Sequence, residues 1–200
     1  MVDVIPTRGA ALSLAEDQRF LENGYEFLDE KRMLLASTLL EELAAWRAAS
    51  AEYDAAMQTA VATLKSALGR HGFDSLALYP TGDGAADGLA LTSRNFLGLG
   101  LLQPVMASWE PPKPMPAPDA SDAAEACRSA FAALVPLAIR TALHRRNILR
   151  LIREYRATER RARALENVIL PETVATLNAV TEYLDQSDQE EALRIRNART

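Results

Sequence analysis

A seven-residue leucine repeat near the N-terminus is the feature that most constrains what this chain can fold into. The leucines that define it are Leu14, Leu21, Leu28 and Leu35. From Leu39 to Ala67 the apolar pattern continues in steps of four and three residues, with two successive fours near Leu39 that indicate a stutter. Residues at this spacing form one stripe along a helix, which packs against a partner helix in a coiled coil. No proline occurs between Arg8 and Leu68, so we expect one coiled-coil helix over residues 1–69.

A second long helix is predicted over residues 120–200. Ser121 is a suitable N-cap, and Asp122 and Glu125 place negative charge near the helix N-terminus. The apolar side of this helix, which should pack against the first helix, includes Ile148, Ile152 and Tyr155. Pro136 and Pro171 are expected to interrupt it.

The middle of the chain, residues 70–119, has a different character. It contains most of the glycines and nearly all the prolines, and short apolar stretches such as SLALYP, GLALTS and NFLGLGLLQP. The TGDG segment, residues 81–84, favours a tight turn. We therefore expect a small lobe with short strands or a β-hairpin, followed by a stiff proline-rich connector at 111–118.

These three parts predict a mainly α fold. Neither long helix can bury its apolar stripe alone, and the simplest arrangement is an antiparallel two-helix coiled coil. The middle lobe would connect the two helices at one end.

Composition narrows the class of function. The net charge of -5 argues against a general nucleic-acid binder, and a single cysteine fits a reducing compartment. No run of about 18 uncharged apolar residues is present, so we expect a cytoplasmic chain that meets a membrane only through another protein.

No catalytic constellation is evident in the sequence. His71 and His144 are isolated, Cys127 sits among small apolar residues, and the glycines of TGDGAADG match neither a Walker loop nor a dinucleotide fingerprint. Packing or solvated roles are the simpler interpretation of each. We expect no catalytic residue, metal or cofactor, and no enzyme activity of the chain alone.

An arginine-rich stretch is the most informative charge feature. Nine arginines, two glutamates and no lysine occur between Arg140 and Arg163. Helical geometry places four of them largely opposite the apolar side: Arg146, Arg150, Arg153 and Arg160. This face fits a solvated surface, a docking surface for acidic proteins or, less well, a phosphate-binding surface without aromatic stacking partners.

Several segments carry a family resemblance. They are IPTRGAALSL with Arg8 and Gly9, GYEFLDEKRMLL with Lys31 and Arg32, NFLGLGLLQP, and a C-terminal segment with Arg160, Arg161, Ala164, Leu165, Glu166 and Pro171, followed by Glu190, Glu191, Arg194 and Arg196. In this order they resemble the D subunit of the V-type and archaeal-type rotary ATPases, over nearly the whole chain. Asp29, the polar segment 185–189 and the proline-rich connector depart from the family pattern.

The resemblance implies a central rotor shaft. The two terminal helices would insert into a hexamer of catalytic A and regulatory B subunits. The middle lobe would bind the small F subunit and rest on a funnel-shaped subunit above the membrane rotor ring. The arginine face Arg146, Arg150, Arg153 and Arg160 would meet the hexamer, and Pro171 would bend the C-terminal helix. A coiled-coil adaptor and a nucleic-acid-binding helical hairpin are the alternatives.

Overall fold

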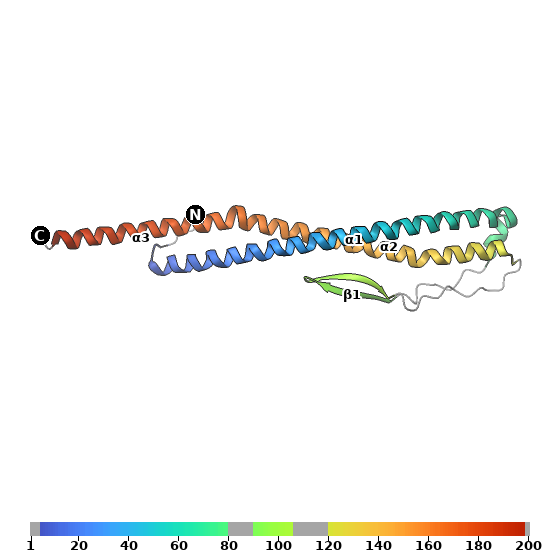
Figure 1. Ribbon diagram of the computed structural model, residues 1–200, viewed down its shortest axis with the longest axis horizontal. Helices are drawn as coiled ribbons and strands as arrows, with labels where there is room; N and C mark the ends of the chain where they lie inside the picture. Colours follow the sequence, from blue (N-terminus) through green and yellow to red (C-terminus); the bar gives the residue numbers. More distant parts are fainter. Residues whose placement is uncertain (1–4, 80–89, 106–119, 199–200) are drawn as a thin grey trace. The chain divides into compact units, whose positions relative to one another are not determined.

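A computed structural model of the chain describes residues 5–79, 90–105 and 120–198. Its elements are α1 (Arg8–Ala77), β1 (Ala90–Phe96), β2 (Leu99–Val105), α2 (Asp122–Ala164), a π-helix η2 (Leu165–Ile169) and α3 (Leu170–Ala198) (Figure 1). The fold is mainly α with a two-stranded antiparallel hairpin, as predicted. The predicted turn at 81–84 and the connector at 111–118 lie outside the described residues.

The chain divides into two compact units. The first contains residues 1–36 and 154–200, and the second contains residues 37–153.

In the first unit the start of α1 packs antiparallel to the C-terminal helices. Arg8 contacts Asp188, and Lys31 contacts Glu154, so the two segments run in opposite directions. Leu14, Leu21 and Leu28 are half-buried and Leu35 is fully buried. The buried positions of α2 and α3 in this unit are Thr158, Ala162 and Val180.

In the second unit the rest of α1 packs antiparallel to the start of α2. The carboxylates of Glu42 and Glu52 contact His144 and Arg140, which again pairs the helices in opposite directions. Small residues line α1 here: Ala49, Ala60 and Ala67 are buried. On α2 the buried positions of this unit include Leu143, Asn147 and Leu151, whereas Ile148 and Ile152 beside them, and Tyr155 in the first unit, are half-buried.

The ends of the helices follow local capping chemistry. The amide of Ala10 donates to the Thr7 hydroxyl at 3.1 Å, and that of Ala124 donates to the predicted cap Ser121 at 3.2 Å. α1 continues past the predicted end at residue 69 to Ala77, with a kink at Gly72, where φ is 72°. Ser75 to Ala77 of the SLALYP stretch are therefore helical, which corrects their assignment to a strand-containing lobe.

The two prolines of the C-terminal region behave differently. α2 continues through Pro136 without a break, contrary to our expectation. Before Pro171 the helix is interrupted by η2, in which the Leu170 amide bonds to the carbonyl of Leu165, five residues back. The wider turn accommodates a residue that has no N–H and would otherwise clash with the preceding turn. The ribbon changes direction close to this junction (Figure 1).

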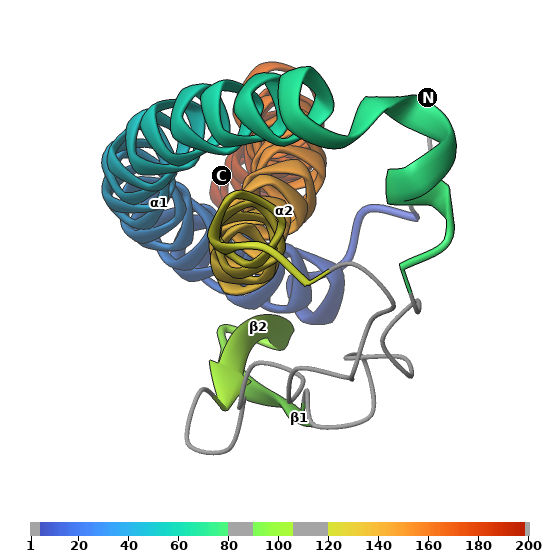
Figure 2. The same ribbon diagram turned by 90° about the vertical axis from the view of Figure 1, so that its right-hand side faces the viewer.

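The hairpin joins its strands through a two-residue turn. Leu97 and Gly98 have φ angles of 50° and 86°, the positive values that a type I′ turn requires. Asn95 Oδ1 accepts a hydrogen bond from the Gly98 amide at 3.1 Å. Ser93 pairs with Leu102 and Asn95 with Gly100 across the strands. In the second unit the hairpin lies beside α2, on the side away from α1 (Figure 2).

One stretch passes a simple test for a membrane span. The helical region Asp122–Ala198 contains an 18-residue window of mean hydropathy 1.3, of which 17% is buried. A single such helix, judged by length and composition only, is weak evidence of membrane insertion.

Candidate functional site

The side of α2 that faces the hairpin holds it through an asparagine. Asn147, which is 2% exposed, accepts a hydrogen bond from the Leu102 amide at 2.8 Å and donates to the Leu102 carbonyl at 2.9 Å. A carboxamide has both an acceptor and a donor, so it pairs with β2 as a neighbouring strand would.

Arg150, one helical turn later, continues this pairing. Its Nη1 donates to the carbonyl of Gly100. Gly100 and Leu102 are two residues apart, so their free backbone groups point to the same edge of β2. Asn147 and Arg150 together cover that edge, and we call them the hairpin clamp.

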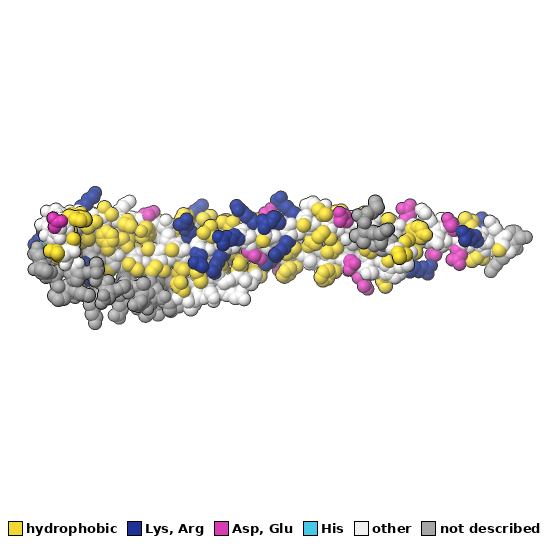
Figure 3. Space-filling view, turned by 180° about the vertical axis from the view of Figure 1, so that it is seen from behind, with side chains coloured by type: hydrophobic (Ala, Val, Ile, Leu, Met, Phe, Trp, Pro, Cys, Tyr) yellow, Lys and Arg dark blue, Asp and Glu magenta, His cyan; other side chains and the backbone are white. Residues whose placement is uncertain are grey.

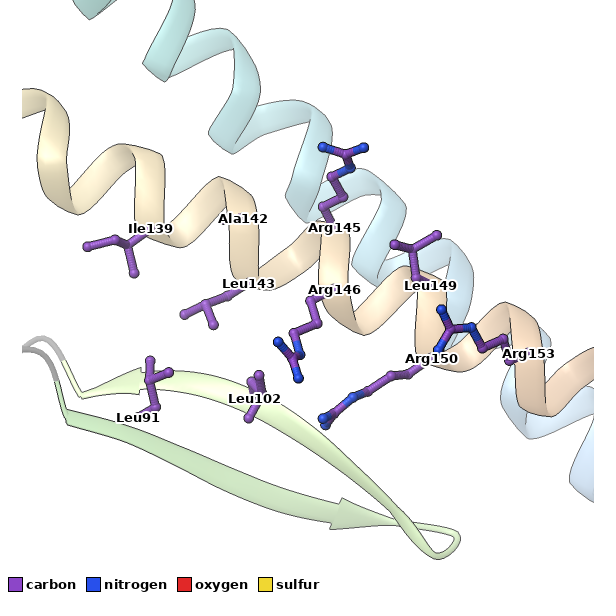
Figure 4. A pocket seen from close by; sticks show the side chains of 10 residues that line it. All are labelled: Leu91, Leu102, Ile139, Ala142, Leu143, Arg145, Arg146, Leu149, Arg150 and Arg153. Carbon is purple, nitrogen blue, oxygen red and sulfur yellow. The ribbon is translucent and has the colours of Figure 1, made fainter.

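An open groove of about 710 Å³ lies between the hairpin and α2. Its lining combines apolar and cationic side chains and is Leu91, Leu102, Ile139, Ala142, Leu143, Arg145, Arg146, Leu149, Arg150 and Arg153. Arg146 and Arg150 extend toward the hairpin, whereas Arg145 points away from it (Figure 4). Among the described residues that line the groove none is a carboxylate, so this lining favours an acidic ligand.

The four arginines predicted to face a hexamer do not form one uniform surface. Arg146 and Arg153 are exposed and line the groove. Arg150 is half-buried and bonded to the hairpin, and Arg160 is exposed outside the groove. In the space-filling view, Lys and Arg side chains gather next to hydrophobic side chains (Figure 3). The hairpin therefore occupies part of the face that the sequence led us to regard as outward.

The cationic motif positions of the N-terminal helix are paired. Lys31 Nζ lies 2.6 Å from Glu154, and both side chains are largely buried, at 15% and 26% exposure. Arg32 contacts Asp29 at 2.5 Å, and Arg8 contacts Asp188 at 2.8 Å. Asp29 and Asp188 each lie against a cation of these motif positions.

The remaining motif positions are mostly at the surface. The exposed ones are Gly9, Arg160, Arg161, Ala164, Glu166 and Pro171. Leu165 is half-buried, and a Cβ added at Gly24 would lie 3.9 Å from its Cδ1. An alanine at position 24 would therefore meet the leucine in ordinary van der Waals contact.

The isolated histidines and the cysteine have ordinary packing partners. His144 Nδ1 lies 2.8 Å from Glu42 Oε2, and His71 Nε2 bonds the Ser121 hydroxyl that caps α2. Burial raises the pKa of the Cys127 thiol, against a smaller opposite effect of the Thr63 hydroxyl. Within residues 5–79, 90–105 and 120–198, no group of three or more His, Cys, Asp or Glu could hold a metal ion.

Reasoning from the sequence missed Asn147. Its spacing could have indicated that it is buried, because Asn147 lies four residues from both Leu143 and Leu151 on the apolar side of the helix. A lone amide at a buried position needs a polar partner, and the hairpin backbone supplies it.

Comparison with known proteins gives a consistent identity. The family model for the D subunit of ATP synthase matches residues 10–200. A V-type ATP synthase D subunit from Thermotoga neapolitana is 23% identical over 195 residues, covering 98% of this chain and 96% of the relative. A V-type ATP synthase D subunit from Anaeromyxobacter dehalogenans is 29% identical over 204 residues, covering 96% of this chain and 94% of the relative. The chain therefore belongs to the family of ATP synthase D subunits.

Proposed function

We propose that this chain is the central rotor shaft of a V/A-type rotary ATP synthase. It transmits torque between ATP hydrolysis or synthesis in a catalytic hexamer and proton or sodium transport in the membrane sector. The observation that carries the proposal is the family match over residues 10–200, together with relatives of nearly the same length. The chemistry of ATP belongs to other subunits, and this chain takes no catalytic part.

The pairing of helices supports a mechanical role. In each unit, two helices run antiparallel and contact each other through charged pairs and buried apolar residues. Paired helices resist bending and twisting better than a single helix, which a torque-bearing element requires. An asymmetric shaft within a three-fold hexamer also biases which catalytic site is open at a given angle.

The partners follow from this role. They are the catalytic A and regulatory B subunits around the helices, the small F subunit, and the funnel-shaped subunit on the membrane rotor ring. The chain would then be cytoplasmic and peripheral, and it would reach the membrane only through the complex. Of the four arginines predicted to face the hexamer, Arg160 is the one that is exposed and outside the groove.

Native mass spectrometry of the co-expressed soluble subunits tests the assembly. We expect one copy of this chain for each hexamer. A free chain, or equimolar binding to single subunits, would instead indicate a coiled-coil adaptor.

A coupling assay tests the torque itself. Complexes reconstituted in vesicles with and without this chain are compared for ATP hydrolysis and for ATP-driven ion uptake. We expect ion uptake only with the chain present. Equal uptake in both preparations would rule out a shaft.

A further inference from the structure

The groove between α2 and the hairpin has the chemistry of a docking site for a protein segment. Among its ten lining residues, four are arginines and none is acidic, although the whole chain carries a net charge of -5. The lining of the groove is therefore positively charged, whereas the protein as a whole is negatively charged.

The arginines of the groove are not neutralised within the described part of the chain. Arg8, Arg32 and Arg140 each contact a carboxylate. No such contact occurs for Arg145, Arg146, Arg150 or Arg153 within the ranges that the structure covers. A ligand that supplies carboxylates would find these cations unoccupied by acidic groups.

Apolar side chains accompany the charge. Leu91 is 52% exposed and Leu149 is 47% exposed at the groove, and Leu102 and Leu143 contribute to its lining. The volume of about 710 Å³ falls within the roughly 300–1,000 Å³ range of clefts that enclose a ligand. A free inorganic anion would leave the leucines uncovered, whereas an amphipathic segment would satisfy both components.

The spacing of the cations defines the ligand more closely. Arg146, Arg150 and Arg153 follow one another by four and three residues, so they lie along one side of α2 over about 10 Å. Arg150 is bonded to the hairpin, so the two remaining cations are Arg146 and Arg153, and carboxylates seven residues apart on a partner helix match their spacing. The hairpin clamp fixes the opposite wall, because Asn147 and Arg150 hold β2 by three hydrogen bonds.

We propose that this groove binds an acidic amphipathic helix of another subunit of the same ATP synthase. Its carboxylates pair with Arg146 and Arg153, and a large apolar side chain beside them packs on Leu91 and Leu149. The inference rests on the proposed function for the identity of the complex. Within that function, the acidic helix would remain bound to the rotor at this groove.

Site-specific photo-cross-linking in the assembled complex tests the proposal. The probe is p-benzoyl-phenylalanine in place of Leu149, with the same probe at exposed Arg156 as the matched position outside the groove. We expect the probe at 149 to capture a peptide of another subunit with two carboxylates seven residues apart, which is the spacing of Arg146 and Arg153. Capture of a basic or uncharged segment, of a segment of this chain, or of nothing would overturn the proposal.

Charge reversal supplies the second measurement. Arg146→Glu combined with Arg153→Glu should lower the cross-linking yield at 149 about tenfold, whereas Arg156→Glu should leave it unchanged. An equal loss of cross-linking yield in both variants would indicate that the overall charge of the surface matters, and it would contradict specific binding in the groove. Retained yield after nuclease treatment is expected, and its loss would indicate a nucleic acid.

Native mass spectrometry of the same samples separates two kinds of failure. A complex with one copy of this chain per hexamer but no acidic cross-link would overturn the groove and leave the rotor role intact. Absence of the complex itself would overturn the rotor role and, with it, this inference.

Discussion

Among single residues, Thr158 combines complete burial with an unmet hydrogen bond. It is fully buried, and its hydroxyl has no hydrogen-bond partner in the part of the chain that the structure describes. A buried hydroxyl without a partner costs free energy because it has lost its bonds to water. Thr158→Val has nearly the same shape and should raise the free energy of unfolding by about 1 kcal/mol, measured by chemical denaturation.

Thr141→Val is the control for that substitution. The Thr141 hydroxyl donates to the Leu137 carbonyl at 2.9 Å, so its removal relieves no unmet bond. We expect no gain in stability for Thr141→Val. A gain of similar size in both variants would show that valine stabilises these helices for another reason.

Asn147 determines how firmly the hairpin is held. Asn147→Ala removes both bonds to Leu102 and leaves the amide of Leu102 without its partner on α2. We expect hydrogen exchange at the Leu102 amide to become about tenfold faster. The measurement is amide exchange followed by mass spectrometry or NMR.

A neighbouring substitution shows whether the effect is specific. The Thr92 hydroxyl is exposed and lies 3.5 Å from the Gln103 carbonyl, which is a weak contact. Thr92→Val should leave exchange at Leu102 unchanged. If Asn147→Ala also leaves it unchanged, the clamp does not hold the strand.

At the scale of elements, the π-helix before Pro171 is the most informative irregularity. Leu165 and Leu170 are half-buried, whereas all four residues between them are exposed. Successive inward-facing residues are therefore five positions apart here, instead of the three or four of an α-helix. The extra residue keeps both flanking helices in contact with α1. It also prevents a clash between the Pro171 ring and the carbonyls of the preceding turn. The Thr173 hydroxyl donates to the carbonyl of Ile169 at 2.8 Å.

Deletion of Val168, which is 50% exposed, tests this account. The deletion should restore α-helical register and place Pro171 in a helix interior, at a cost of about 3 kcal/mol in the free energy of unfolding. Deletion combined with Pro171→Ala should recover most of that loss, because alanine supplies the missing N–H. Equal losses in thermal or urea unfolding of the two variants would contradict the role assigned to the proline.

Much of the element order is predictable from the sequence, and the reasons are local. The spacing of Leu14 to Leu35 and the cap at Ser121 depend only on neighbouring residues. The leucines lie within α1, and Ser121 caps the start of α2. No Asn-Gly or Asp-Gly pair marks the turn at Leu97 and Gly98, so its position was not evident. The groove was also hidden, because it depends on Asn147 meeting a strand 45 residues away in the chain.

At the scale of the whole molecule, many large apolar side chains remain at the surface. On α1, Phe20, Phe27 and Leu34 are 76%, 63% and 43% exposed and are spaced by seven residues. This second stripe lies one position before the buried one. Exposed apolar surface arranged in this way is typical of a chain that is covered in an assembly.

The isolated chain should therefore bind the hydrophobic dye ANS. Phe20→Ser combined with Phe27→Ser should reduce ANS fluorescence and leave the helical circular dichroism unchanged, because both side chains point away from the partner helix. The same substitutions should weaken assembly with partner subunits in native mass spectrometry. Unchanged dye binding would mean that other surfaces dominate.

The hairpin clamp has a consequence for aggregation. A free strand edge invites strands of other molecules, and a sheet with two free edges can grow without limit. Here the edge of β2 is covered at Gly100 and Leu102, and Pro104 of the same strand has no amide hydrogen to offer. Within the described residues neither outer edge has a neighbouring strand, but only the edge of β2 is covered by side chains, so the hairpin can accept one further strand beside β1 and cannot seed a sheet that extends in both directions.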